Sequence, residues 1–224
     1  MSPDLARKAA AEALGTAFLV MAVIGSGIAA TRLSPNDVGL QLLENSLITG
    51  AALGALILAL QPVSAAFNPV VTLVERGLGL IDNRSTWLLV AAQVVGGLAG
   101  AVLANLMFGL DAVSISHTTR YGGHLWLGEV IATLGLVLVI FGSLRSGRTD
   151  TIAYAVGGYI TAAYGFTSST SFANPAVTIA RTLSDTFAGI SPTSAFAFLD
   201  FQLIGGAIAF GLVRLLYPTP QETP

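Results

Sequence analysis

The chain has 224 residues, of which 54% are hydrophobic and only 10% are charged, and its formal net charge is −2. A soluble domain carries roughly 25% charged residues, so this composition excludes an ordinary soluble protein and predicts a membrane protein with several spans. The nearly neutral charge excludes a basic nucleic-acid-binding surface. The absence of cysteine excludes disulfides and thiolate metal sites.

The first apolar run follows Arg7 and Lys8, an arrangement that also occurs in signal peptides. Glu12 lies inside this run, and a similar run recurs later in the chain, so we predict a retained membrane helix. Six segments have about the length that a bilayer span needs. They are residues 9–30, 39–60, 86–108, 125–144, 151–167 and 195–217. We expect one transmembrane domain over residues 1–217 and a disordered tail over residues 218–224.

Two further apolar segments, residues 68–77 and 174–184, follow the second and the fifth predicted spans and are too short to cross a bilayer. Each begins with an Asn-Pro pair and a small apolar residue: Asn68, Pro69 and Val70 in the first, Asn174, Pro175 and Ala176 in the second. Asparagine is a favourable N-cap, and proline fits the first helical turn. We therefore predict two half-helices whose positive ends lie within the membrane. One Asn-Pro pair alone would indicate an ordinary loop or cap.

The two halves of the chain repeat each other beyond the Asn-Pro pairs. Glu12 in the first predicted helix corresponds to Glu129 in the fourth, and Gln93 in the third corresponds to Gln202 in the sixth. The halves are residues 1–112 and 113–217. Because each half has three spans, the second half must enter the membrane from the opposite side, which predicts an inverted repeat.

The distribution of Lys and Arg predicts the orientation in the membrane. If the N-terminus is cytoplasmic, the cytoplasmic segments hold Arg7, Lys8, Arg76, Arg84, Arg145, Arg148 and Arg214. The opposite segments hold Arg32, Arg120 and Arg181. Cytoplasmic loops carry the excess of positive residues, so we expect both termini on the cytoplasmic side.

These features resemble the aquaporin, or major intrinsic protein, family over nearly the whole chain. The resemblance is carried by Glu-x-x-Gly-Thr in the first helix, by PVSAAFNPVVTL around the first Asn-Pro pair and by TSFANPAVT around the second. It implies an all-α membrane fold of six transmembrane helices plus two half-helices. It also implies a homotetramer in which each subunit has a pore that passes water or small neutral solutes passively and blocks protons, without a cofactor.

The sequence departs from this family at the position after the second Asn-Pro-Ala. The family usually has an arginine there, which forms the narrowest part of the pore, and this chain has Val177. Offsets from the two motifs place the other filter residues at Thr49 or Ile48, at Ala162 or Ala163, and at Ser171. We choose Thr49, because the loop before Asn68 looks one residue short, and Ala162.

A filter of threonine, alanine, serine and valine would be wide, weakly polar and without a fixed charge. It would suit polyols, urea-sized molecules and undissociated metalloid hydroxides such as arsenous acid. The segment TSFANPAVTIAR is most similar to an arsenite-linked bacterial branch of the aquaglyceroporins, which implies a bacterial inner membrane. Loss of the arginine also leaves a path open to small anions, because the half-helix dipoles favour negative charge.

Arg181 lies four residues after Val177, at a spacing that shares one helix face. It is either a displaced arginine that lines the outer vestibule or a helix-end arginine turned to a loop or a lipid headgroup, and both interpretations stay open. His117 and His124 could form a metal pair, but without nearby carboxylates we interpret them as loop residues. We expect no metal site.

Glu12 and Glu129 are carboxylates at membrane depth, where an unpaired charge is costly. They could couple transport to protons, as in a secondary transporter. Alternatively, each accepts hydrogen bonds from the loop before its half-helix, and their symmetric placement favours this structural role. A membrane protein with a closed pore is a third possibility. The sequence contains no catalytic constellation, so we do not expect an enzyme.

Overall fold

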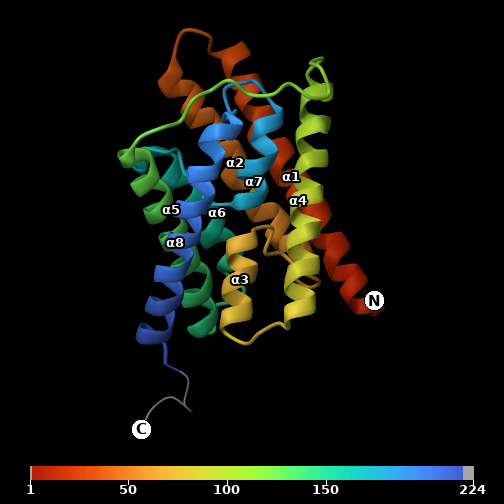
Figure 1. Ribbon diagram of the computed structural model, residues 1–224, viewed down its shortest axis with the longest axis vertical. Coiled ribbons are helices and arrows are strands. Elements are labelled where there is room, and N and C mark those ends of the chain that lie inside the picture. Colours follow the sequence, from red (N-terminus) through yellow and green to blue (C-terminus); the bar gives the residue numbers. More distant parts are fainter. Residues whose placement is uncertain (1, 219–224) are drawn as a thin grey trace.

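The computed structural model describes residues 2–218, and every regular element among them is a helix (Figure 1). The long helices are α1 (Pro3–Leu33), α2 (Val38–Leu60), α4 (Asn83–Met107), α5 (Gly123–Arg145), α6 (Ile152–Phe166) and α8 (Pro192–Leu216). The short ones are α3 (Pro69–Gly77), α7 (Pro175–Ala180) and the 3-10 turn η1 (Arg181–Leu183). The predicted architecture of six long helices and two half-helices is therefore confirmed. Residues 219–224 of the predicted tail lie outside the described part of the chain.

Helix α6 is shorter than the other five long helices. Five helices, α1, α2, α4, α5 and α8, are long and apolar enough to cross a membrane by length and composition. Helix α6 has 15 residues, about 22 Å at 1.5 Å per residue, and begins and ends within one residue of the predicted span. Residues 167–174 then connect it to the start of α7.

The helices pack as the inverted repeat predicts. Helix α1 packs against α4, its counterpart α5 packs against α8, and α2 packs against α6 to join the halves. Figure 1 shows the start of α1 and the end of α8 on the same side of the molecule, with α3 in that half and α7 in the other. The two half-helices therefore approach the middle from opposite sides.

Glycines after the repeated glutamines allow these helices to approach closely. A side chain on Gly96 would collide with the carbonyl oxygen of Ala13 in α1, and one on its counterpart Gly205 would collide with that of Val130 in α5. Small residues at helix contacts are typical of membrane proteins, since they let the backbones come near each other. The repeated Gln-x-x-Gly-Gly pattern thus encodes the same helix pairing in both halves.

Candidate functional site

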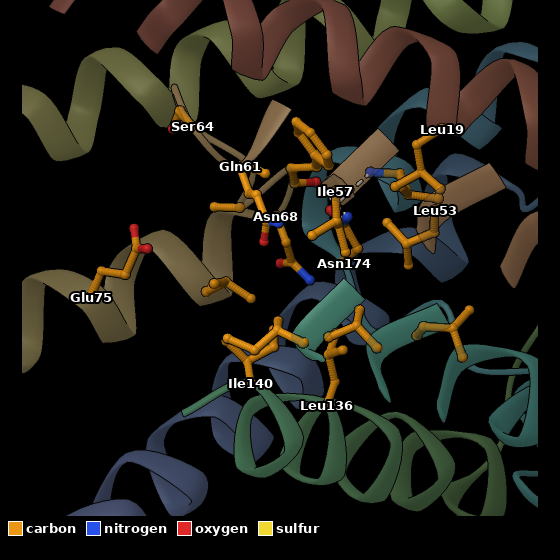
Figure 2. Close-up of a pocket in the computed structure, with 18 of the residues that line it drawn as sticks. Leu19, Leu53, Ile57, Gln61, Ser64, Asn68, Glu75, Leu136, Ile140 and Asn174 are labelled. Carbon is orange, nitrogen blue, oxygen red and sulfur yellow. Dashed lines mark hydrogen bonds between the residues drawn. The ribbon is translucent and has the colours of Figure 1, made fainter. Parts of the chain in front are cut away.

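The two half-helices meet at Asn68 and Asn174, whose side chains lie beside each other in Figure 2. The Oδ1 of Asn68 accepts a hydrogen bond from the N–H of Val70 at 3.0 Å, and the Oδ1 of Asn174 accepts one from the N–H of Ala176 at 3.0 Å. Each asparagine therefore caps its own half-helix, as predicted.

The amide nitrogen of each asparagine binds the other half of the protein. Asn68 Nδ2 donates to the carbonyl oxygen of Ala173 at 2.7 Å, and Asn174 Nδ2 donates to that of Phe67 at 2.7 Å. Each amide has two N–H donors, so one remains for the contents of the cavity that both asparagines line. The other four residues of the predicted centre, Pro69, Val70, Pro175 and Ala176, are buried and do not line the cavity.

The residues before the two asparagines have an unusual backbone conformation. Phe67 has a φ of 47° and Ala173 a φ of 48°, in the left-handed region that is uncommon for residues other than glycine. Such residues cost of order 1–3 kcal/mol and persist only where the surrounding structure holds them. Here the conformation turns each carbonyl oxygen toward the opposite asparagine. No local sequence signal indicates this.

Glu12 holds the loop before α3 in this conformation. Its carboxylate accepts hydrogen bonds from the N–H of Ala66 at 2.9 Å and of Phe67 at 2.7 Å. The side-chain amide of Gln93 also donates to it at 2.7 Å. Glu12 is 0% exposed and does not line the cavity. Its partners are those expected for a structural carboxylate.

Glu129 does the same for the loop before α7. It accepts hydrogen bonds from the N–H groups of Phe172 and Ala173, both at 2.9 Å, and from the side-chain amide of Gln202 at 2.5 Å. It is also 0% exposed and lies outside the cavity lining. Both carboxylates therefore position the residues that precede the asparagines, and neither faces the cavity.

A cavity of about 610 Å³ runs along the meeting point of the half-helices. Figure 2 shows apolar side chains around the asparagines, with Leu19, Leu53 and Ile57 on one side and Leu136 and Ile140 on another. We call the end near the chain termini the Glu75 end and the opposite end the Arg181 end, after residues that line each. The walls are thus mainly apolar, with polar groups at the centre and the two ends.

Three of the four predicted filter residues line this cavity: Thr49, Ser171 and Val177. Thr49 is 2% exposed, whereas its alternative Ile48 is 48% exposed on the outer surface. The Oγ of Ser171 is buried without a hydrogen-bond partner within residues 2–218. The first helical turn of α7 places Val177 at the cavity, where the family resemblance leads us to expect an arginine.

The structure corrects the predicted filter residue of α6. Ala162 is exposed and Ala163 is fully buried, and neither lines the cavity. Tyr164 lines it instead, and its hydroxyl lies 3.4 Å from Thr49 Oγ1. Counting back from the second Asn-Pro pair misplaced this residue, because residues 167–174 are not helical. A usable signal was the spacing of four residues between Ile160 and Tyr164, which puts both on one helix face.

Arg181 lies at the cavity and is bound to a neighbouring loop. It is 2% exposed and lines the cavity one turn beyond Val177. Its Nε donates to the carbonyl oxygen of Ala188, and its guanidinium carbon lies 3.3 Å from the ring centroid of Phe172. The structure thus combines features of both interpretations: the side chain faces the cavity and also binds a loop.

The connection between α4 and α5 closes over the residues that follow α7. The N–H of Ser116 donates to the carbonyl oxygen of Thr182 at 2.9 Å, and His117 Nδ1 pairs with Asp185 Oδ2 at 2.9 Å. Hydrogen bonds from the backbone N–H and the imidazole of His117 lower the pKa of Asp185 below its usual value. No group of three or more His, Asp or Glu side chains in the described part could hold a metal ion.

Comparisons with known proteins agree with this geometry. The family model of the major intrinsic proteins matches residues 1–153. Aquaglyceroporin AqpS of Rhizobium meliloti (strain 1021) is 46% identical over 214 residues, 95% of this chain and 91% of that protein. Aquaporin-5 of Homo sapiens is 32% identical over 151 residues, 63% of this chain and 54% of that protein. The structure of the aquaglyceroporin from Plasmodium falciparum superposes with a TM-score of 0.73 over 96% of this chain and 98% of that one, at 18% identity, which shows the shared fold.

Proposed function

The chain belongs to the major intrinsic protein family of membrane channels, and we propose that its pore passes water, polyols such as glycerol, and metalloid hydroxides such as arsenous acid. The observation that carries this proposal is Val177, which lines the cavity at the first turn of α7. A valine removes the guanidinium expected there, and with it the bulk and the fixed charge. Solutes larger than water then have room at this point.

The chemistry of the filter supports solutes with both hydroxyl and apolar parts. Thr49, Tyr164 and Ser171 bring hydroxyl groups to the cavity, and Val177 brings an apolar surface. Moving a polar group out of water without a new hydrogen bond costs several kcal/mol. Hydrogen bonds to the filter hydroxyls would replace part of the solute's hydration and so lower this cost. Tyr164 is bulkier than the alanine expected at α6. We therefore propose a filter that is open on the Val177 side and narrowed on the Tyr164 side.

The centre of the pore supports passage of neutral solutes without protons. The N-termini of α3 and α7 face each other there, and the positive ends of two helix dipoles disfavour a cation. The runner-up, a proton-coupled transporter, would need Glu12 or Glu129 to exchange protons with the cavity. Both are enclosed and hydrogen-bonded away from it, so the geometry favours a channel.

Solute flux into proteoliposomes tests the proposed function. We expect the purified protein to speed the uptake of water, glycerol, urea and arsenous acid, each down its own gradient. An imposed pH gradient should leave these rates unchanged, because Glu12 and Glu129, the carboxylates that a proton-coupled transporter would use, are enclosed away from the cavity. Uptake against a solute gradient that collapses with the pH gradient would contradict a channel and favour the transporter.

Thr49→Phe is expected to restrict the larger solutes. The added ring enters the filter opposite Tyr164, so glycerol flux should fall by about tenfold, equivalent to a barrier about 1.4 kcal/mol higher, while water flux falls much less. Ile48→Phe is the matched control, because the same change on the exposed neighbouring position leaves the cavity untouched. The placement of the filter is wrong if the two variants transport glycerol equally well.

We further propose a homotetramer in a bacterial inner membrane, with both termini in the cytoplasm. The assembly rests on the family resemblance. The orientation rests on the seven Lys and Arg residues at the side of the termini against three at the other. Under this orientation the Arg181 end of the pore opens outward.

A further inference from the structure

We infer that the Arg181 end of the cavity binds a small monovalent oxyanion, which then competes with neutral solutes for entry. The inference rests on the proposed pore, and it adds a ligand class and a site to it. The site is Arg181 with the ring of Phe172, supported by Arg120. Three observations carry it: the free donors of Arg181, a second arginine on the same ring without a carboxylate partner, and the carboxylates that line the other end of the cavity.

The guanidinium of Arg181 has donors to spare. It carries five N–H donors in a planar fork, and the described residues supply one acceptor, the carbonyl oxygen of Ala188, to its Nε. The side chain is 2% exposed and lines the cavity. It is held in place by that bond and by the ring of Phe172. An oxyanion matches the fork of a guanidinium better than it matches the compact ammonium of lysine.

A second arginine contacts the same ring. The guanidinium carbon of Arg120 lies 5.2 Å from the ring centroid of Phe172. Its Nε donates to the carbonyl oxygen of Gly189 at 3.0 Å, and its Nη2 donates to that of Phe187 at 3.3 Å. Backbone carbonyls orient this arginine without neutralising it. Two positive charges therefore share one aromatic ring at the mouth.

Carboxylates only partly offset these charges. Within residues 2–218, neither Arg120 nor Arg181 forms an ion pair. Glu129 is buried nearby, but its oxygens accept hydrogen bonds from Phe172, Ala173 and Gln202. Asp185 is partly exposed and accepts hydrogen bonds from the backbone N–H and the imidazole of His117, and neither arginine forms an ion pair with it. Both arginines therefore lack a carboxylate partner that would compete with a bound anion.

The residues that line the Glu75 end of the cavity include two carboxylates. Glu75 and Asp150 line it, and Figure 2 shows the carboxylate of Glu75 at the edge of the cavity. Lys8, which also lines this end, forms an ion pair with Asp4 at 3.0 Å. Among the side chains that line the cavity, an anion therefore meets carboxylates at the Glu75 end and a guanidinium with unused donors at the Arg181 end. For this reason we place the anion beside Arg181.

Competition by nitrate tests the site, since nitrate is small, planar and ionised at every pH of the assay. Glycerol uptake into proteoliposomes is measured while nitrate replaces gluconate, a bulky anion, at constant ionic strength. We expect nitrate to slow glycerol uptake by the wild-type protein. Arg181→Gln should raise the half-inhibiting nitrate concentration about 10- to 100-fold, because hydrogen bonds to a charged group are lost.

Arg32→Gln is the matched control. Arg32 has the same chemistry, with Nη2 bonded to the carbonyl oxygen of Phe108 at 2.8 Å and the guanidinium 5.2 Å from that ring, but it does not line the cavity. It should keep the nitrate sensitivity of the wild type. If Arg181→Gln does not accumulate as a folded protein, Arg120→Gln is the variant that tests the site. We expect its glycerol uptake to be several-fold less sensitive to nitrate.

Glycerol uptake without nitrate separates this site from the proposed pore. The oxyanion site is overturned if the wild type takes up glycerol normally and nitrate does not slow it. It is also overturned if Arg181→Gln or Arg120→Gln keeps the wild-type nitrate sensitivity. Either result leaves the proposed channel intact. Absence of glycerol uptake in the wild type would instead count against the proposed function.

Discussion

Val177→Arg should reduce glycerol and arsenous acid flux about 10- to 100-fold, as an added barrier of about 1.4–2.7 kcal/mol would, while water flux falls far less. The introduced side chain enters the cavity at the first turn of α7, where it fills the open side of the proposed filter. It also brings a second guanidinium within one helical turn of Arg181. The two charged groups would bind water strongly at the constriction. Stopped-flow swelling of proteoliposomes with each solute measures the effect.

Val177→Leu serves as the control for size alone. It adds one methylene group without charge or hydrogen-bond donors, so it should lower glycerol flux only modestly. Water flux reports whether each variant is folded and inserted. A Val177→Arg protein that keeps the wild-type ratio of glycerol to water flux would show that selectivity is decided elsewhere in the cavity.

Glu129→Ala should prevent a stable channel from forming. The change removes the acceptor of the N–H groups of Phe172 and Ala173, and the Gln202 amide keeps only its bond to Thr178 Oγ1. Each buried donor left without an acceptor costs about 1–3 kcal/mol, against a total stability of about 5–15 kcal/mol for a typical protein. The change also releases Ala173 from its left-handed conformation, and Asn174 then loses its position. Thermal unfolding and size-exclusion profiles in detergent measure the loss.

Two variants separate this structural role from proton coupling. Glu44→Ala removes a carboxylate on α2 that accepts a hydrogen bond from the hydroxyl of Ser34 at 2.7 Å, and we expect it to be nearly as stable as the wild type. Glu129→Gln keeps one acceptor oxygen and removes the titratable group. If it folds as stably as the wild type but loses solute flux, the structural interpretation fails and proton coupling gains support.

Much of the fold was predictable because its signals are local. The apolar runs, the Asn-Pro caps and the repeated Glu and Gln positions each depend on a few neighbouring residues. They placed the long helices within a few residues, apart from the earlier start of α1 at Pro3. The inverted packing followed from the count of three spans in each half.

The residues that line the cavity were predictable only in part. Thr49, Ser171 and Val177 were placed at the cavity because they lie at fixed distances from the Asn-Pro motifs along regular or well-matched segments. Tyr164 was missed because an irregular segment of eight residues, 167–174, separates it from the second motif. An error of two residues on a helix turns the side chain to nearly the opposite face. Here the error led us to choose the exposed Ala162 in place of Tyr164, which lines the cavity.

The sequence by itself determined the family, the two half-helices with their asparagine caps, and the absence of an arginine after the second motif. Only the tertiary structure decided that Glu12 and Glu129 hold Phe67 and Ala173 in left-handed conformations, and that Arg181 returns a guanidinium to the cavity. The physical reason is the range of the interactions. Caps and helix periods act over a few residues, whereas each of these contacts joins segments from different helices, and no local pattern records which of them meet.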